Sequence, residues 1–284
     1  MRKKIAFFLI FLVQIVFAIS AQFSSAEELS FATLLPPAPA QKAIENTQYF
    51  FEGIKDRKDM KAFFFDIQKA KQDLYTKIKP LTRFHARLPC SLSAEPQSIF
   101  ELSLPQMARI YLIFDALENG NLVKQIAQII NNYKEGNFYE PGGLGLLKNG
   151  QILLEAIPSS IIEERDGAEA SYILPFSDFA RPHIFTFHMH PLGKSGPAPG
   201  PSYKVEIDND AKEAKFGHDI GMALFRAKNH GDYHHLLISK MYSRYFNVDY
   251  YFAQKLPEPP SYDPSDYCGK LIGFRIVDLG VWSY

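Results

Sequence analysis

Apolar residues recur at helical spacing through the first part of the chain. The pattern covers residues 40–55, 58–77 and 105–117, where polar residues fill the intervening positions. A further amphipathic helix is predicted over residues 121–133. We find no motif that carries chemistry in residues 27–118. This segment is therefore predicted to be a helical N-terminal region.

Short apolar runs bounded by turn residues replace the helical spacing after residue 139. Asn149-Gly150 separates the first two runs and predicts a tight β-hairpin, because both residues adopt positive φ readily. Loops rich in proline are expected over residues 192–202 and 256–267. The strands that we expect lie at 143–147, 151–157, 184–190, 234–241, 246–252 and 270–281.

Two histidines stand at the end of one of these strands. The run is Phe187-His188-Met189-His190-Pro191, and the proline ends the strand because it cannot donate a ladder hydrogen bond. Side chains alternate between the faces of a strand, so His188 and His190 are predicted to point the same way. Two adjacent imidazoles suit one metal ion. The structural alternative is a pair of partly buried, hydrogen-bonded histidines.

A single carboxylate precedes the glycine-rich run at the start of the first strand. Glu140 is followed by Pro141-Gly142-Gly143, so few side chains crowd it and we expect it to be accessible to a ligand. The alternative is a solvated glutamate on a surface loop, which is the usual position of this residue type.

Composition limits the classes of partner and the compartment. The chain has 31 basic and 31 acidic residues and thus no net charge, so composition gives no support for a nucleic-acid partner. Residues 1–26 combine a basic start with a short apolar run and are predicted to be a signal peptide. An uncleaved N-terminal anchor is the rival interpretation. We expect an exported protein, periplasmic or secreted, with no membrane attachment after cleavage and an oligomeric state that the sequence leaves open.

Export changes the interpretation of the two cysteines. Cys90 and Cys268 could form a single disulfide in an oxidising compartment. Two buried free thiols are the alternative.

Taken together, these motifs resemble the JAMM metallopeptidases, the JAB/MPN family. Their pattern is a glutamate at the start of a glycine-containing strand, followed by H-x-H-P and then S-x-x-D. Glu140, His188 and His190 match the first two parts, and Ser202 matches the start of the third. The resemblance covers residues 119–252, and we assign residues 119–284 to the JAMM-like metallopeptidase domain.

The third part of the motif is atypical. Three residues after Ser202 stands Val205 instead of an aspartate, so the third metal ligand should be Asp208, Asp210 or Asp219. A capping box at Asp210 predicts a helix over 210–228, which would leave Asp208 just before the helix and near the metal. Asp219 is the alternative if Gly217 breaks this helix.

The resemblance implies a fold, a cofactor and an activity. It implies an α/β fold in which a mixed, mainly antiparallel sheet is flanked by helices. His188, His190 and Asp208, or alternatively Asp219, would bind Zn²⁺. Glu140 would act as general base and Ser202 would stabilise the oxyanion. The activity implied is hydrolysis of an amide bond through a metal-bound water, in a peptide or an isopeptide-linked protein.

Two other functions remain open at this point. One is a catalytically inactive JAB/MPN-like module that binds a peptide. The other is a zinc peptidase of another family that acts on peptidoglycan, because H-x-H pairs occur there too. Convergence of Glu140 on His188 and His190 would weigh against the latter.

Overall fold

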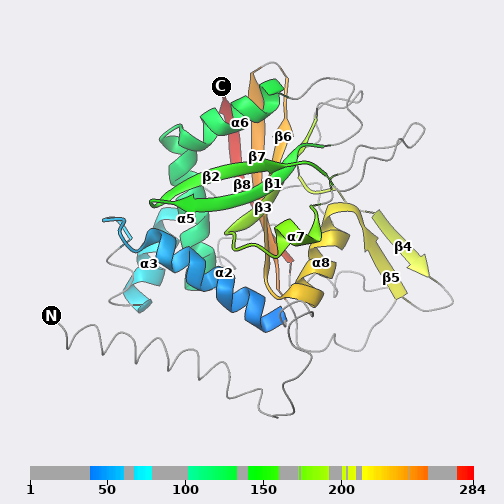
Figure 1. The fold of residues 1–284 in the computed structure, drawn as a ribbon, viewed down its shortest axis with the longest axis horizontal. Helices are drawn as coiled ribbons and strands as arrows, with labels where there is room; N and C mark the ends of the chain where they lie inside the picture. The colour runs from blue at the N-terminus through cyan, green and yellow to red at the C-terminus, as the bar shows by residue number, and fades with distance from the viewer. Residues whose placement is uncertain are drawn as a thin grey trace, which may run out of the picture. The chain divides into compact units, whose positions relative to one another are not determined.

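A six-stranded sheet organises the part of the chain that the computed structural model describes. Its strand order is β2-β1-β3-β6-β7-β8, and only β3 and β6 run parallel (Figure 1). The α/β fold with a mixed, mainly antiparallel sheet is therefore confirmed. The described residues are 39–60, 67–78, 102–132, 140–159, 172, 174–191, 200–202, 204–208, 213–242, 244–254 and 274–284.

Six helices and eight strands have defined bounds within these residues. The helices are α2 (Pro39–Ile54), α3 (Ile67–Ile78), α5 (Leu104–Glu118), α6 (Asn121–Asn132), α7 (Phe176–Phe179) and α8 (His218–His230). The strands are β1 (Gly142–Lys148), β2 (Gln151–Ile157), β3 (Phe185–His190), β4 (Lys204–Asp208), β5 (Glu213–Gly217), β6 (Tyr233–Lys240), β7 (Tyr245–Ala253) and β8 (Phe274–Ser283).

The six expected strands all occur near their predicted positions. Asn149 and Gly150 join β1 to β2 with φ values of 52° and 74°, as a tight hairpin turn with two positive φ angles requires. The predicted helix over 210–228 is wrong. β5 occupies its first half and pairs with β4, and α8 begins only at His218, directly after Gly217.

The two faces of the sheet carry two separate apolar cores. Alternation along β3 places Phe187 and Met189 on the face covered by α2, α3, α5 and α6. The opposite face packs against α7 and α8, through residues such as Leu237 and Tyr251. The helices of the N-terminal region thus share a core with the sheet on the face that His188 does not occupy.

The outer edge of β2 is covered by α6 instead of being open. The Gln125 side chain accepts a hydrogen bond from Leu154 N at 2.7 Å and donates one to Ile152 O at 2.9 Å. The carboxamide of Gln125 therefore stands in for a neighbouring strand. Covering an edge in this way removes a template for pairing with another chain.

The glycines of β1 are required by close packing. A Cβ on Gly143 would lie 1.9 Å from the backbone oxygen of Glu155, and one on Gly145 would lie 2.1 Å from the Phe185 ring. Side chains at these positions would push apart β1 and its neighbours. The glycines next to Glu140 thus serve strand packing.

Substituting Gly143 with alanine should lower the free energy of unfolding by about 3 kcal/mol or more, because β2 backbone atoms cannot yield to the new methyl group. Gly120→Ala is the matched control. Its added Cβ meets nothing within 4 Å, so only the positive φ of 78° should cost about 1 kcal/mol. Urea unfolding of the two variants measures the difference, and equal losses would refute the packing role.

Several expectations fall on residues outside the described part. The signal peptide at 1–26 lies outside it, and so do Cys90 and Cys268. Among the helices that the structure describes, none has the length and apolar character needed to cross a bilayer.

Candidate metal centre

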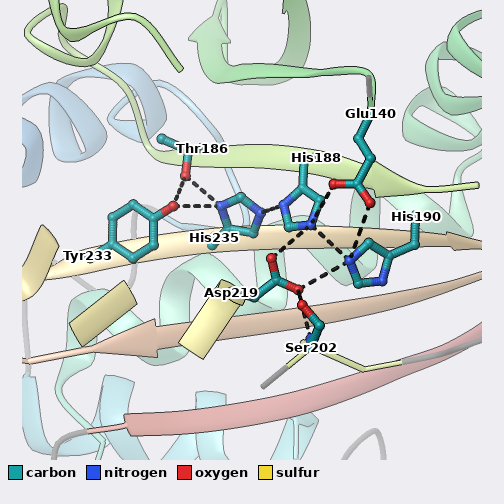
Figure 2. A network of polar contacts seen from close by, with 8 residues as sticks. All are labelled: Glu140, Thr186, His188, His190, Ser202, Asp219, Tyr233 and His235. Atoms are coloured by element: carbon teal, nitrogen blue, oxygen red, sulfur yellow. Dashed lines mark hydrogen bonds and ion pairs between the residues drawn. The ribbon is translucent and has the colours of Figure 1, made fainter. Parts of the chain in front are cut away.

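His188 and His190 point from the same face of β3, as the alternation along the strand predicts. Their Nε2 atoms lie 3.1 Å apart (Figure 2). His188 is 5% exposed, and the residue between the two histidines, Met189, is buried in the opposite core. The pair therefore presents two ring nitrogens toward one point.

Glu140 joins the two histidines because β1 runs beside β3. Met189 N donates to Pro141 O at 2.8 Å, and this hydrogen bond fixes the chain next to Glu140. The Glu140 carboxylate oxygens lie 3.8 Å from His188 Nε2 and 3.9 Å from His190 Nε2. Glu140 is 8% exposed, so it is not a solvated loop residue. These three residues form a group that could hold a metal ion.

Asp219 supplies a second carboxylate at the same point. It lies in the first turn of α8, with Oδ1 3.2 Å from His188 Nε2 and Oδ2 3.1 Å from His190 Nε2. Asp208 is the last residue of β4, and its side chain is not among those described. The position of Asp219 follows from the start of α8 directly after Gly217.

The spacing of the donor atoms fits a tetrahedral metal ion. Ligand atoms that each lie about 2 Å from zinc are about 3.3 Å from one another in a tetrahedral arrangement. His188, His190 and Asp219 have separations of 3.1–3.2 Å, whereas the Glu140 oxygens stand farther from the rings at 3.8–3.9 Å. Asp219 therefore stands closer to the two imidazoles than Glu140 does.

Asp219 is held as an anion. Burial raises the pKa of the Asp219 carboxyl, but the facing His188 and His190 rings outweigh burial and bring the pKa well below its ordinary value. Its place in the first turn of α8 adds to this, because a helix N-terminus favours negative charge. An ionised carboxylate is the form that binds a metal ion.

Ser202 contacts Asp219 twice. Its backbone N–H and its hydroxyl donate to Asp219 Oδ2 at 2.7 and 2.9 Å, and its carbonyl oxygen accepts from Ile220 N at 3.3 Å. The single hydroxyl proton is thus used on the carboxylate in this arrangement. Ser202 fixes the orientation of Asp219, and the role in oxyanion stabilisation stays a prediction.

Asp249 and Asn247 on β7 support the loop that carries Ser202. Gly200 N and the Asn247 side chain donate to Asp249 Oδ2 at 3.0 and 2.9 Å, and Asp249 is fully buried. Our sequence analysis did not identify these two residues. The sequence contains a pattern that could have identified them, because these two polar residues alternate with apolar ones along an otherwise buried strand.

The second ring nitrogen of His188 has a partner that our sequence analysis also missed. His188 Nδ1 lies 2.7 Å from His235 Nε2. His235 Nδ1 in turn lies 2.6 Å from Thr186 Oγ1 and 2.9 Å from the Tyr233 hydroxyl. Burial lowers the pKa of His235 well below its ordinary value, and the neighbouring His188 adds to the effect. His235 is therefore a neutral imidazole.

Two further histidines, His183 and His234, have different contacts. His183 Nδ1 donates to Arg181 O at 2.8 Å, and its ring packs against Phe179, which indicates a structural role. His234 points to the opposite face from His235, with Nδ1 2.7 Å from the Tyr250 hydroxyl. The side chain of His218 is not among those described.

In comparisons with protein-family models, curated proteins and solved structures, none matches this chain. The functional argument therefore rests on the residues themselves. A buried carboxylate beside two imidazoles that share a face is compatible with a metal-dependent hydrolase.

Proposed function

We propose that the protein is an exported zinc-dependent peptidase or isopeptidase with a JAMM-type site. One observation carries the proposal: the carboxylates of Glu140 and Asp219 approach the Nε2 atoms of the same two histidines, but at two different distances. The nearer carboxylate suits a metal ligand and the farther one suits a base.

The positions of these residues in the fold favour the JAMM-type arrangement. Glu140 directly precedes β1, the histidines end β3, and Ser202 bonds the carboxylate of Asp219. The proposed serine–aspartate pair is intact in space although it is separated in sequence by more than the usual spacing. The alternative hypothesis, a zinc peptidase of another family, is disfavoured because the Glu140 carboxylate lies beside both His188 and His190.

Zinc is the metal that this donor set favours. Two imidazole nitrogens and one carboxylate oxygen are a common set of protein ligands in catalytic zinc sites, where a fourth position stays open. Hard cations such as Mg²⁺ and Ca²⁺ prefer oxygen ligands throughout. We therefore propose His188, His190 and Asp219 as the zinc ligands.

The residues around the metal position have distinct tasks in amide hydrolysis. When bound, zinc supplies Lewis acidity, which acidifies water and polarises a carbonyl group. Glu140 accepts the proton of the attacking water and delivers it to the leaving amine nitrogen. Ser202, through its two hydrogen bonds, keeps the Asp219 carboxylate directed at the two imidazoles.

The substrate class follows from the resemblance and from export. A peptide bond or an isopeptide bond to a protein tail is what the JAMM-type site would cleave. For an exported protein, the target is either a host protein or a cross-linked peptide of the cell envelope. Both classes contain an amide bond that this site can hydrolyse.

Metal content and hydrolysis of the purified mature protein test the proposal. We expect about one zinc per chain in wild type and a large loss in His188→Ala, since the variant removes a ligand. Peptides, isopeptide-linked conjugates and peptidoglycan fragments are then screened for zinc-dependent cleavage. Full metal loading without cleavage of any class would favour the inactive binding module. Substoichiometric zinc that does not fall further in His188→Ala would refute the metal site.

A further inference from the structure

The ring of His188 contacts two different groups through its two nitrogens. Nε2 faces the carboxylates of Glu140 and Asp219, whereas Nδ1 faces His235 Nε2 at 2.7 Å (Figure 2). Two imidazole nitrogens at this separation share one proton, so one of them donates and the other accepts. The direction of this hydrogen bond decides which nitrogen of His188 carries the proton.

Only one direction leaves His188 able to bind a metal ion. If His188 Nδ1 donates to His235, the neutral ring has a free lone pair on Nε2, which faces the proposed metal position. If His235 Nε2 donates instead, a neutral His188 must carry its proton on Nε2, and this proton blocks the ligand atom.

Two hydroxyl groups contact the His235 ring on the side away from His188. They allow the hydrogen bond in which His188 Nδ1 donates to His235 Nε2. Thr186 Oγ1 lies 2.6 Å from His235 Nδ1 and 2.8 Å from the Tyr233 hydroxyl oxygen, and its own hydroxyl can donate to His234 O at 3.4 Å. With its proton directed at His234 O, Thr186 Oγ1 keeps two lone pairs, which can accept the protons of the Tyr233 hydroxyl and of His235 Nδ1. His235 Nε2 is then left without a proton and can accept from His188.

We propose that His235 is a positioning residue of the metal centre, which accepts the Nδ1 proton of His188 and so keeps His188 Nε2 free to bind metal. The inference rests on the proposed zinc site and adds to it a residue that contacts a metal ligand, His188, without contacting the metal. Histidine ligands generally donate their other N–H to an acceptor that fixes the ring and its tautomer. Here that acceptor is the buried imidazole of His235, whose other ring nitrogen contacts Thr186 and Tyr233.

Zinc affinity of the full-length mature protein, measured by chelator competition, tests this role. His235→Leu should weaken zinc binding about 10–100-fold, as is usual when a supporting partner is lost. His235→Gln should stay within about threefold of wild type, because its carboxamide can accept from His188 and donate to Thr186. The matched control is His234→Leu, which removes the neighbouring histidine on the other face and should leave the affinity unchanged.

The outcomes separate this inference from the proposed function. If wild type binds zinc and His188→Ala does not, but His235→Leu binds as tightly as wild type, the positioning role is wrong and the metal site stands. If wild type itself binds no zinc, the proposed function fails and the inference fails with it.

A nitrogen-15 spectrum of zinc-loaded wild type decides the question if His235→Leu does not fold. The spectrum should show coupling across the hydrogen bond between His188 Nδ1 and His235 Nε2, with the proton attached to His188. A proton attached to His235 Nε2 would overturn the proposal. This measurement reports the tautomer directly and requires no substrate.

Discussion

Replacing Glu140 with glutamine should lower turnover by about 10²–10⁴-fold while the metal stays bound. The change preserves the size of the side chain but removes its ability to accept a proton. The Glu140 oxygens lie 3.8–3.9 Å from the two histidine Nε2 atoms, farther than the Asp219 oxygens at 3.1–3.2 Å. Loss of activity without loss of zinc is therefore the expected pattern.

Glu155→Gln is the matched control for this prediction. Glu155 lies on β2 and pairs with Arg181 at 2.7 Å, a surface ion pair of the kind that contributes about 0–1 kcal/mol to stability. Its loss should change neither turnover nor zinc content. If Glu140→Gln cleaves as fast as wild type, Glu140 is not the base. If the variant loses its zinc, Glu140 is a ligand and the proposed division of roles is wrong.

Replacing Asp219 with asparagine should release the metal. The amide oxygen can still accept from Ser202, so the local hydrogen bonds survive, but the anionic ligand is gone. Zinc affinity should fall by more than about 100-fold, beyond the 10–100-fold that loss of a supporting partner costs. Chelator competition measures the change, and turnover should fall with zinc occupancy.

Asp208→Asn tests the other candidate from the sequence motif. We expect zinc affinity in this variant to equal that of wild type, because Asp219 already lies 3.1–3.2 Å from both histidines. If zinc is released by Asp208→Asn and retained by Asp219→Asn, then Asp208 is the third ligand. Asp219 would then be left as an ordinary buried partner of the histidines.

The central residues of the site were predictable from strand geometry. Alternation along 184–190 required His188 and His190 to share a face, and the order of the strands brought Glu140 to them. These relations depend on local backbone geometry and on an antiparallel neighbour. The shared face of the two histidines can be inferred from the spacing of apolar and turn residues, whereas the place of Glu140 beside them was implied by the resemblance to the JAMM metallopeptidases.

The third carboxylate was harder to assign because two local signals competed. The capping-box pattern at Asp210 favoured a long helix, but residues 213–217 pair with β4 instead, and α8 begins directly after the last residue of this strand, Gly217. The pairing with β4 overrode the helix signal, and it placed Asp219 in the first turn of α8. Short-range patterns cannot report a pairing of this kind.

The support of His188 by His235 depends on a parallel pairing that the sequence does not reveal. β3 and β6 are separated by more than 40 residues, and their register sets Thr186 opposite His235. A one-residue shift would turn His235 to the other face, where His234 now contacts Tyr250. Register between distant strands is fixed by the packing of the whole sheet.

Anomalous diffraction at the zinc edge, from crystals grown with zinc, tests the proposed metal centre most directly. We expect a single strong peak about 2 Å from Nε2 of His188, Nε2 of His190 and one carboxylate oxygen of Asp219, with Glu140 outside bonding distance. A peak elsewhere in the protein, or none between these side chains at saturating zinc, would contradict a zinc-dependent hydrolase built on this site.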